Sequence, residues 1–239
     1  MDPALRDMNK RTIVRIKRST LSSVVTDRLR ELIISGAYEP GSQLSEVELA
    51  ESFGVSRGPI REGLQRLVQD GLLRSEPHRG VYVPRIGPDD IADIYLAREA
   101  IEGAAIRLVS AAPDRGAMGS TLRDLVGQMR TAANADRWNR VAELDMRFHS
   151  EVVRASGSAR LQRMYSTLID ETRVLLSMTA NVSGREDLVD EHGQIAELIA
   201  SGNPTGAMDT LARSFHDSRR TLTDRAARVG VLTADGSSA

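Results

Sequence analysis

The stretch that decides the fold runs from Ser42 to Pro84 and reads SQLSEVELAESFGVSRGPIREGLQRLVQDGLLRSEPHRGVYVP. Ser45 and Glu48 have the spacing of a capping box, in which each side chain satisfies a free backbone N–H at the start of a helix. This spacing predicts a helix over residues 45–53. Beyond the tight Gly54-Val55 connection, Ser56 is the candidate N-cap of a second helix that ends at Gly71.

Apolar periodicity supports this second helix and another one upstream. The second helix carries a single stripe of Ile60, Leu64, Leu67 and Val68, and a helix over residues 22–35 carries Val25, Leu29, Leu32 and Ile33. A short β-hairpin is predicted after the second helix. Its signals are an apolar alternation at 72–75, a Pro-His-Arg-Gly turn at 77–80 and a returning strand at 81–83. Two short helices followed by a basic hairpin are typical of a winged helix-turn-helix.

Two arginines indicate DNA as the partner of this unit. Arg57 and Arg61 lie near the N-terminal end of the second helix and off its apolar stripe. A recognition helix presents side chains to base edges and phosphates from that position. The alternative is a solvated helix with ordinary surface arginines. The order of the helix pair, the caps and the hairpin favours double-stranded DNA.

The composition is that of an ordinary globular protein. Of the 239 residues, 41% are hydrophobic and only 3% aromatic, so the core must be built mainly from aliphatic side chains. Residues 1–87 carry 14 Lys and Arg against 11 Asp and Glu, and the rest carry 18 against 22, which suits a DNA-binding head on a larger domain. The chain has no cysteine and no apolar run of membrane-spanning length. We therefore expect a soluble, cytoplasmic protein without membrane contact.

Five segments are expected along the chain. They are a flexible basic arm at 1–20, a winged helix-turn-helix domain at 21–84, a Pro-Gly linker at 85–88, an all-α domain at 89–228 and a flexible tail at 229–239. Helical periodicity between breakers predicts six helices in the all-α domain, over 89–112, 115–134, 137–156, 158–182, 185–201 and 203–228. The predicted fold class is mainly α, a winged helix-turn-helix domain followed by a helical bundle.

One carboxylate and three imidazoles are predicted to face the interior of this bundle. On helical steps of 100°, the apolar arcs of three different helices include or border Asp145, His149, His192 and His216. A buried aspartate without a partner is costly, and a divalent metal bound to all four groups removes that cost. A single inward histidine is more often an ordinary core residue, but the set of four favours one divalent ion per chain. Zn²⁺ is the first choice, with Mn²⁺ and Ni²⁺ as alternatives.

Arg98 and Glu102 form a second inward polar pair, spaced i,i+4 within the apolar arc of their helix. They could satisfy each other as a buried structural ion pair. Alternatively, Glu102 orients Arg98 toward a cavity, where the guanidinium binds the carboxylate of a small effector. The sequence leaves both interpretations open. Arg173, at the edge of the apolar face of its own helix, is a weaker candidate for the same role.

These residues resemble a known family. The N-terminal part is similar to the DNA-binding domain of GntR-type bacterial transcription regulators in segments 44–50, 55–64, 71–72 and 79–83 and at Leu67. The C-terminal part is similar to the FCD effector domain of the FadR branch. The matching residues are Arg98, Glu102, Asp145-x₃-His149, Glu191-His192, Ser201-Gly202 and His216. Six bundle helices suggest its VanR-like subgroup. The resemblance covers about residues 20–225.

The resemblance implies a homodimer that binds an inverted-repeat operator, and a repressor is the expected kind of regulator. A small organic acid is expected to control its affinity for DNA. It places the DNA contacts on Ser56, Arg57, Pro59, Arg61, His78, Arg79 and Gly80, and the metal ligands on Asp145, His149, His192 and His216. Two departures stand out. Val47 replaces an arginine that some members carry in the first helix, which puts that contact in doubt, and Ser156-Gly157-Ser158 predicts a changed helix cap without a lost ligand.

Two other functions compete with a DNA-binding regulator. A metal-dependent enzyme acting on a small carboxylate could use an Asp/His₃ metal to activate water, with the DNA-binding head as an accessory domain. No separate general base or nucleophile stands at a useful spacing for it. A DNA-architectural protein fits poorly, because the net charge is only −1 and the basic surface is small.

Overall fold

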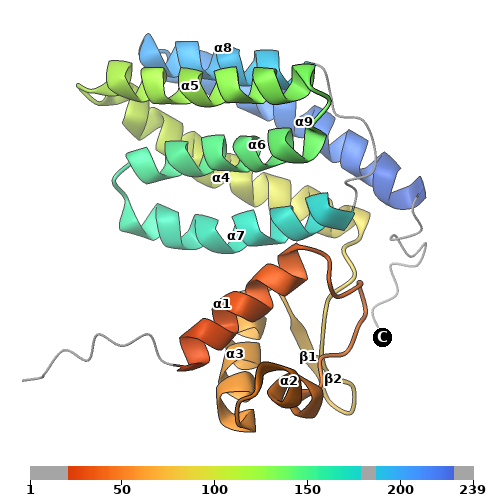
Figure 1. Ribbon diagram of the computed structural model, residues 1–239. Coiled ribbons are helices and arrows are strands. Elements are labelled where there is room, and N and C mark those ends of the chain that lie inside the picture. Colours follow the sequence, from red (N-terminus) through yellow and green to blue (C-terminus); the bar gives the residue numbers. More distant parts are fainter. Residues whose placement is uncertain (1–20, 179–186, 229–239) are drawn as a thin grey trace, which may run out of the picture.

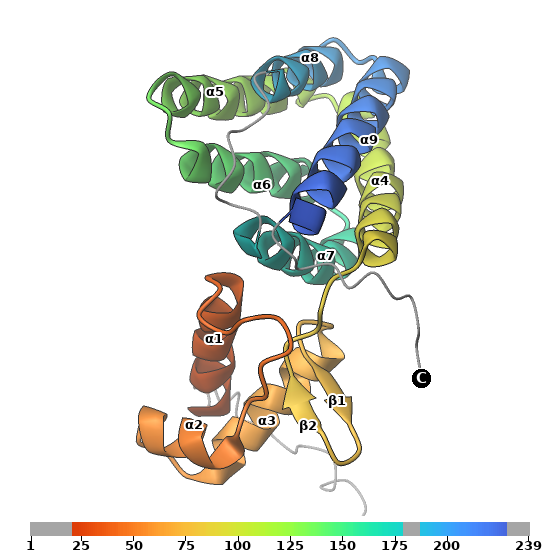
Figure 2. The same ribbon diagram turned by 90° about the vertical axis from the view of Figure 1, so that its right-hand side faces the viewer.

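Figures 1 and 2 show the computed structural model, which describes residues 21–178 and 187–228. The basic arm predicted at 1–20, the tail predicted at 229–239 and the helix ends predicted at 179–182 and 185–186 lie outside the described residues. Within the described ranges the elements are α1 (Leu21–Ile34), α2 (Glu46–Phe53), α3 (Arg57–Gln69), β1 (Arg74–Glu76), β2 (Gly80–Tyr82), α4 (Pro88–Ala111), α5 (Arg115–Asn134), α6 (Trp138–Ala155), α7 (Ala159–Met178), α8 (Leu188–Ala200) and α9 (Pro204–Arg228).

The N-terminal head is the predicted winged helix-turn-helix. The Ser45 hydroxyl caps α2 by accepting the N–H of Glu48 at 3.4 Å, and Gly54 ends α2 in the left-handed region at φ 64°. Helices α1 and α3 approach closely at Gly63, where a Cβ would lie 3.2 Å from the side chains of Val25 and Thr26. Strands β1 and β2 pair antiparallel with Ser75 opposite Val81, which forms the wing.

The six predicted helices of the C-terminal domain are confirmed as α4 to α9. Pro88, which the sequence assigned to the linker, is instead the first residue of α4, because a proline at this position lacks only an N–H that has no helical partner anyway. The Asp90 carboxylate accepts the Gly87 N–H at 2.7 Å and closes this helix start. At the changed cap before α7, the Ser158 hydroxyl accepts the N–H of Leu161.

The helices pack as a bundle above the head (Figure 1). Helix α5 packs on α6 and α8, while α4 packs on α6, α7 and α9. Helix α7 is the bundle helix nearest the head and contacts α1 (Figure 2). Among residues 21–178 and 187–228, no helix combines the length and the apolar character needed to cross a membrane.

Helices α5 and α8 touch through small residues. A Cβ built on Gly119 of α5 would overlap the Cβ of Ala200 on α8 and lie 3.2 Å from its Cα. Gly127, two turns further along α5, is exposed and has nothing within 4 Å of such a Cβ. The two glycines therefore separate the effect of close packing from the ordinary cost of glycine in a helix.

We predict that Gly119→Ala destabilises the protein by about 1–3 kcal/mol, because the added methyl group forces α5 and α8 apart. The matched change Gly127→Ala should stabilise it by about 0.5–1 kcal/mol through helix propensity alone. Urea denaturation followed by circular dichroism measures both. Equal effects of the two substitutions would contradict the packing described here.

Candidate DNA interface and metal centre

The exposed face of α3 carries the two arginines that the sequence assigned to DNA. Both are more than half exposed, and both bind the carboxylate of Glu46 on α2. Arg61 makes two parallel hydrogen bonds to Glu46 at 2.9 Å, and Arg57 makes one at 3.2 Å. The hydrogen bond from Arg61, followed by that from Arg57, lowers the pKa of Glu46. Glu46 thus holds both guanidinium groups together at the start of the recognition helix, where DNA would have to compete for them.

The remaining predicted DNA residues lie on the same exposed parts of the head. Ser56 is the N-cap of α3, but its hydroxyl makes no cap hydrogen bond and is exposed. His78 and Gly80 shape the tip of the wing with positive φ angles of 65° and 77°. The Arg79 guanidinium lies 3.7 Å from the centre of the Tyr82 ring, and Tyr82 in turn donates a hydrogen bond to Glu76.

Two further head residues complete this surface. Pro59 is half-buried in the first turn of α3. Val47, at the position where the resemblance implies an arginine in some family members, is 47% exposed on α2. Its side chain cannot donate a hydrogen bond, so α2 contributes no cationic contact at this position.

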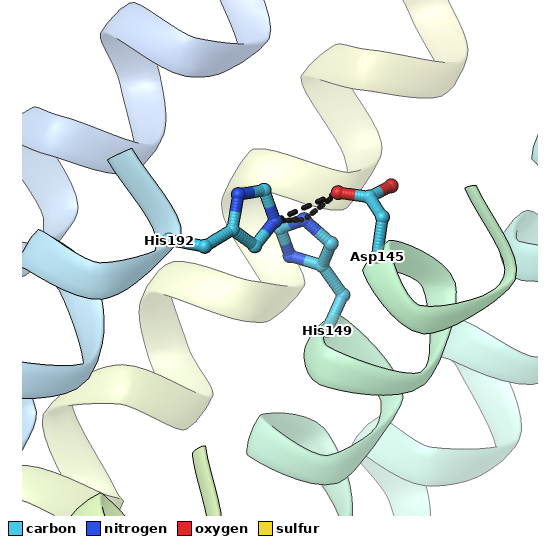
Figure 3. Close-up of side chains that lie close together, drawn as sticks. All are labelled: Asp145, His149 and His192. Carbon is cyan, nitrogen blue, oxygen red and sulfur yellow. Dashed lines mark hydrogen bonds and ion pairs between the residues drawn. The ribbon is translucent and has the colours of Figure 1, made fainter. Parts of the chain in front are cut away.

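Inside the bundle, three of the four predicted metal ligands meet (Figure 3). Asp145 and His149 project from α6, and His192 projects from α8; all three are buried. The Asp145 Oδ1 atom lies 2.7 Å from His192 Nε2 and 3.5 Å from His149 Nε2. The two Nε2 atoms are 3.1 Å apart. Three donor atoms thus converge on one point between α6 and α8.

The outer nitrogens of both imidazoles have their own partners. His192 Nδ1 lies 2.7 Å from the Leu188 carbonyl oxygen, and His149 Nδ1 lies 2.5 Å from Glu102 Oε2. Both acceptors require N–H at Nδ1, so both Nε2 atoms present lone pairs toward each other unless a cation lies between them. Nitrogens bound to one tetrahedral metal at ~2.1 Å are about 3.4 Å apart, a few tenths of an ångström more than the observed separation. The donor set and its spacing therefore fit a divalent metal.

Charge in the network also favours a cation at this point. Burial alone would lower the pKa of His149, but Glu102 and Asp145 raise it to about 9. Burial would raise the pKa of Asp145, but the two histidines lower it strongly. A proton on His149 Nε2 and a metal at the same place satisfy the same demand, so metal binding here would displace a proton.

Glu102 lies behind the candidate metal ligands. It binds His149 Nδ1 with one oxygen and accepts the Arg98 Nε–H at 3.0 Å with the other. Such a carboxylate fixes the orientation and the tautomer of a metal-binding histidine. This position favours the interpretation in which Glu102 orients its neighbours and does not itself meet the effector.

Arg98 brings an unused donor to the same region, and the Tyr165 hydroxyl lies beside Glu102. Arg98 is 1% exposed, and within the described residues its Nη2 atom has no hydrogen-bond partner. Burial, then the Glu102 carboxylate, raises the pKa of Tyr165 well above its usual value, which keeps the hydroxyl a donor. Buried donors without partners are rare and call for a ligand or an ordered water. Tyr165 was not among the residues predicted from the sequence, where its only signal is an aromatic hydroxyl on an inward position of α7.

His216 does not join the metal cluster, and its prediction as a fourth inward ligand is wrong. It is exposed on α9, while the two preceding residues are buried: Phe215 packs 5.4 Å from the His149 ring, and Ser214 donates to Glu191 at 2.6 Å. One helical step of 100° beyond Phe215 carries the side chain out of the apolar face. A residue on the border of a predicted arc can fall on either side.

Arg173 is not brought together with Arg98. It is half-exposed and lies 3.4 Å from Asp170, facing a groove between α1, α6 and α7. Its predicted role as a second effector-binding arginine is therefore unsupported by its position.

A winged helix-turn-helix with an arginine-bearing recognition helix, joined to an α-helical domain with an interior polar site, defines a ligand-responsive class of DNA-binding protein. The comparisons agree. The family described as "Bacterial regulatory proteins, gntR family" matches residues 21–83, and the "FCD domain" family matches residues 93–217. The chain belongs to the GntR family of bacterial transcription regulators and carries an FCD domain. It is a DNA-binding regulator and not an enzyme.

Individual relatives support this assignment. The chain is 30% identical over 193 residues to the probable D-xylose utilization operon transcriptional repressor of Paenarthrobacter nicotinovorans, covering 81% of this chain and 84% of that protein. It is 29% identical over 208 residues to the gluconate operon transcriptional repressor of Bacillus licheniformis, covering 84% and 83%. The crystal structure of a putative GntR regulator from Rhodococcus sp. RHA1 matches with a TM-score of 0.72 and 25% identity, covering 85% and 97%.

Proposed function

We propose that the protein is a cytoplasmic repressor that binds an inverted-repeat operator as a homodimer. In this proposal a small organic acid, bound at a divalent metal inside the FCD domain, controls the affinity for DNA. The observation that carries it is the convergence of Asp145, His149 and His192 on one buried point, close to a buried arginine with an unused donor. Repression is inferred from the relatives, two of which are named as operon repressors.

The DNA contacts follow from the exposed surface of the head. Arg57 and Arg61 reach base edges or phosphates once Glu46 releases them, and the Ser56 hydroxyl and the Arg79 guanidinium add phosphate contacts. Pro59 shapes the first turn of α3, and His78 and Gly80 shape the wing. Glu46 keeps the arginines from binding anions indiscriminately, because each new contact must replace an existing ion pair.

The metal would be held by Asp145, His149 and His192, with Glu102 orienting His149 from behind. One carboxylate and two imidazoles suit Zn²⁺ first, and also Mn²⁺ and Ni²⁺. A bound metal would supply a Lewis-acidic partner for an effector carboxylate. Arg98 Nη2 is a buried protein donor that remains for the rest of the effector.

The outer face of α4 is the surface that best fits a second copy of the chain. Leu96 is 62% exposed, and with Ala100, Gly103 and Met208 of α9 it lines a shallow depression of about 260 Å³. Glu99 and Arg107 flank Gly103 at equal distances along the helix. An antiparallel two-fold crossing at Gly103 would therefore place each Glu99 beside Arg107 of the partner subunit, twice in one interface.

Loss of either arginine on the exposed face of α3 should weaken DNA binding. We expect Arg57→Ala and Arg61→Ala each to weaken operator binding by about 1–3 kcal/mol if the side chain contacts a base. Fluorescence anisotropy on the operator selected by the wild-type protein measures this, with Arg123→Ala on α5 as the control for loss of one exposed positive charge. Wild-type affinity in both folded variants would overturn the assignment of α3.

Loss of His192 should remove one of the three proposed metal ligands. His192→Ala should weaken metal binding by on the order of a hundredfold or more and abolish the effector response, because one of three ligands is lost. His216→Ala is the matched control and should keep wild-type metal content, because His216 is exposed on α9. Elemental analysis and metal titration give the readout. Metal retention by His192→Ala, or an effector response without metal, would refute the metal-centred switch.

A reversed charge at Glu99 should disturb the proposed dimer interface. Glu99→Arg should weaken dimerisation by about tenfold through like-charge contact with Arg107 of the partner subunit, and the double change Glu99→Arg/Arg107→Glu should restore it. Sedimentation velocity without DNA measures the equilibrium, with Glu197→Arg on α8 as the control. An unchanged dimer in Glu99→Arg would exclude this surface, and a monomeric wild-type protein at operator saturation would exclude the homodimer.

A further inference from the structure

One guanidinium joins the recognition helix to the effector domain. Arg30 projects from α1, and its Nη2 atom lies 2.6 Å from Asp70 Oδ2 while its Nη1 atom lies 2.6 Å from Asp170 Oδ2. Asp70 is the C-cap of α3, and Asp170 belongs to α7. A single planar side chain thus binds the end of the DNA-reading helix with one nitrogen and the FCD domain with the other.

This contact is unlike the other ion pairs of α1. The side chains of Arg30, Asp70 and Asp170 are 24%, 32% and 11% exposed, whereas those of the neighbouring pair Arg28 and Glu31 are 61% and 68% exposed. Exposed pairs contribute little, because water and salt screen them and the side chains lose freedom. The Arg30 contacts are short, partly buried and forked, which is the geometry in which arginine pairs are strong.

The charges at this junction require Arg30. The C-terminal end of α3 carries the negative end of the helix dipole, and two carboxylates lie beside it. Burial alone would lower the pKa of Arg30, but the hydrogen bonds and charges of Asp70 and Asp170 raise it. Arg173, on the same helix as Asp170, also lies 3.4 Å from that carboxylate, but Arg30 binds both Asp170 and Asp70. Without Arg30, the two carboxylates lose the cation that they share across the domain boundary.

A second contact restricts the same end of α3. Gly71, at φ 80°, passes so close to Glu171 of α7 that a Cβ there would overlap the Glu171 carboxylate. Consecutive residues of α7 thus lie at the end of the recognition helix, Glu171 beside Gly71 just after the C-cap and Asp170 through Arg30. Arg30 also lines a groove of about 710 Å³ with Met146, which follows the metal ligand Asp145 on α6.

We propose that Arg30 is a positioning residue for DNA recognition and that Asp170 is its anchor on the effector domain. The forked ion pair fixes the orientation of α3 relative to α7, and so relative to the rest of the regulator. Asp170 then influences DNA affinity although it lies outside the DNA-binding domain. This inference rests on the DNA-binding function of the family and does not depend on a metal or an effector.

The test uses the full-length protein and the duplex that the wild-type protein selects from a random library. Asp170→Asn and Arg30→Ala should each weaken binding about tenfold, within the range of ordinary coupling between sites. Arg28→Ala on α1 and Glu197→Gln on α8 are the matched exposed controls and should stay within about twofold of the wild type. Arg30→Lys, a point charge that cannot fork between two carboxylates, should recover only part of the loss.

Two readouts separate positioning from other roles. Asp170→Asn should cause a smaller loss in the Arg30→Ala background than in the wild type, because both changes break the contact between Arg30 and Asp170 and only the pair of Asp170 with Arg173 remains to be lost. The slope of log affinity against log salt should stay at the wild-type value in Arg30→Ala, because a positioning residue neutralises no phosphate.

The proposal is overturned if Asp170→Asn binds within twofold of the wild type, or if the two losses add fully. It is also overturned if the salt slope of Arg30→Ala falls by about one, which would make Arg30 a direct DNA contact. Metal content measured on the same samples keeps this result separate from the metal-centred switch. An unchanged metal content is expected in every one of these variants.

Discussion

The interior of the effector domain depends on one chain of buried polar contacts, which runs from Arg98 through Glu102 and His149 to Asp145 and His192. Charged groups in a protein interior are tolerated only when each finds a partner. Helices α4, α6 and α8 must therefore meet in the one register that closes these distances. The contacts of the two Nδ1 atoms direct both Nε2 atoms toward a single point. The contacts that order the bundle therefore also favour a cation, a proton or a metal ion, at that point.

The position of α6 makes this interior relevant to the DNA-binding surface. Its inward side carries Asp145, and the next residue, Met146, lines the groove that α6 shares with α1 and α7. A change at the metal site can alter DNA affinity only if it favours one arrangement of these packed helices over another. The contacts at Arg30 and Gly71 give α7 a direct connection to α3, in addition to the covalent connection that precedes α4.

Much of this architecture was predictable, because it depends on patterns of residues that are close together in the sequence. Caps, apolar stripes and turn residues fixed the helix-turn-helix, the wing and the six bundle helices, and the inward positions of Asp145, His149 and His192 followed from helical periodicity. The sequence misplaced His216, since a residue at the border of an arc turns inward or outward according to packing. It also left Arg98 and Glu102 ambiguous and missed Arg30 with Asp170, which are 140 residues apart. Contacts between distant helices have no local pattern.

The exposure of His216 changes the chemistry open to the proposed metal. Four protein ligands would fill a tetrahedral zinc ion, whereas Asp145, His149 and His192 alone leave a position free at Zn²⁺ and more at an ion that prefers six ligands. An effector carboxylate bound there would complete the coordination shell, so metal and effector would each raise the affinity for the other by the same factor. In this proposal Arg98 would strengthen the coupling, because its Nη2 atom is buried without a partner and an effector carboxylate would supply an acceptor.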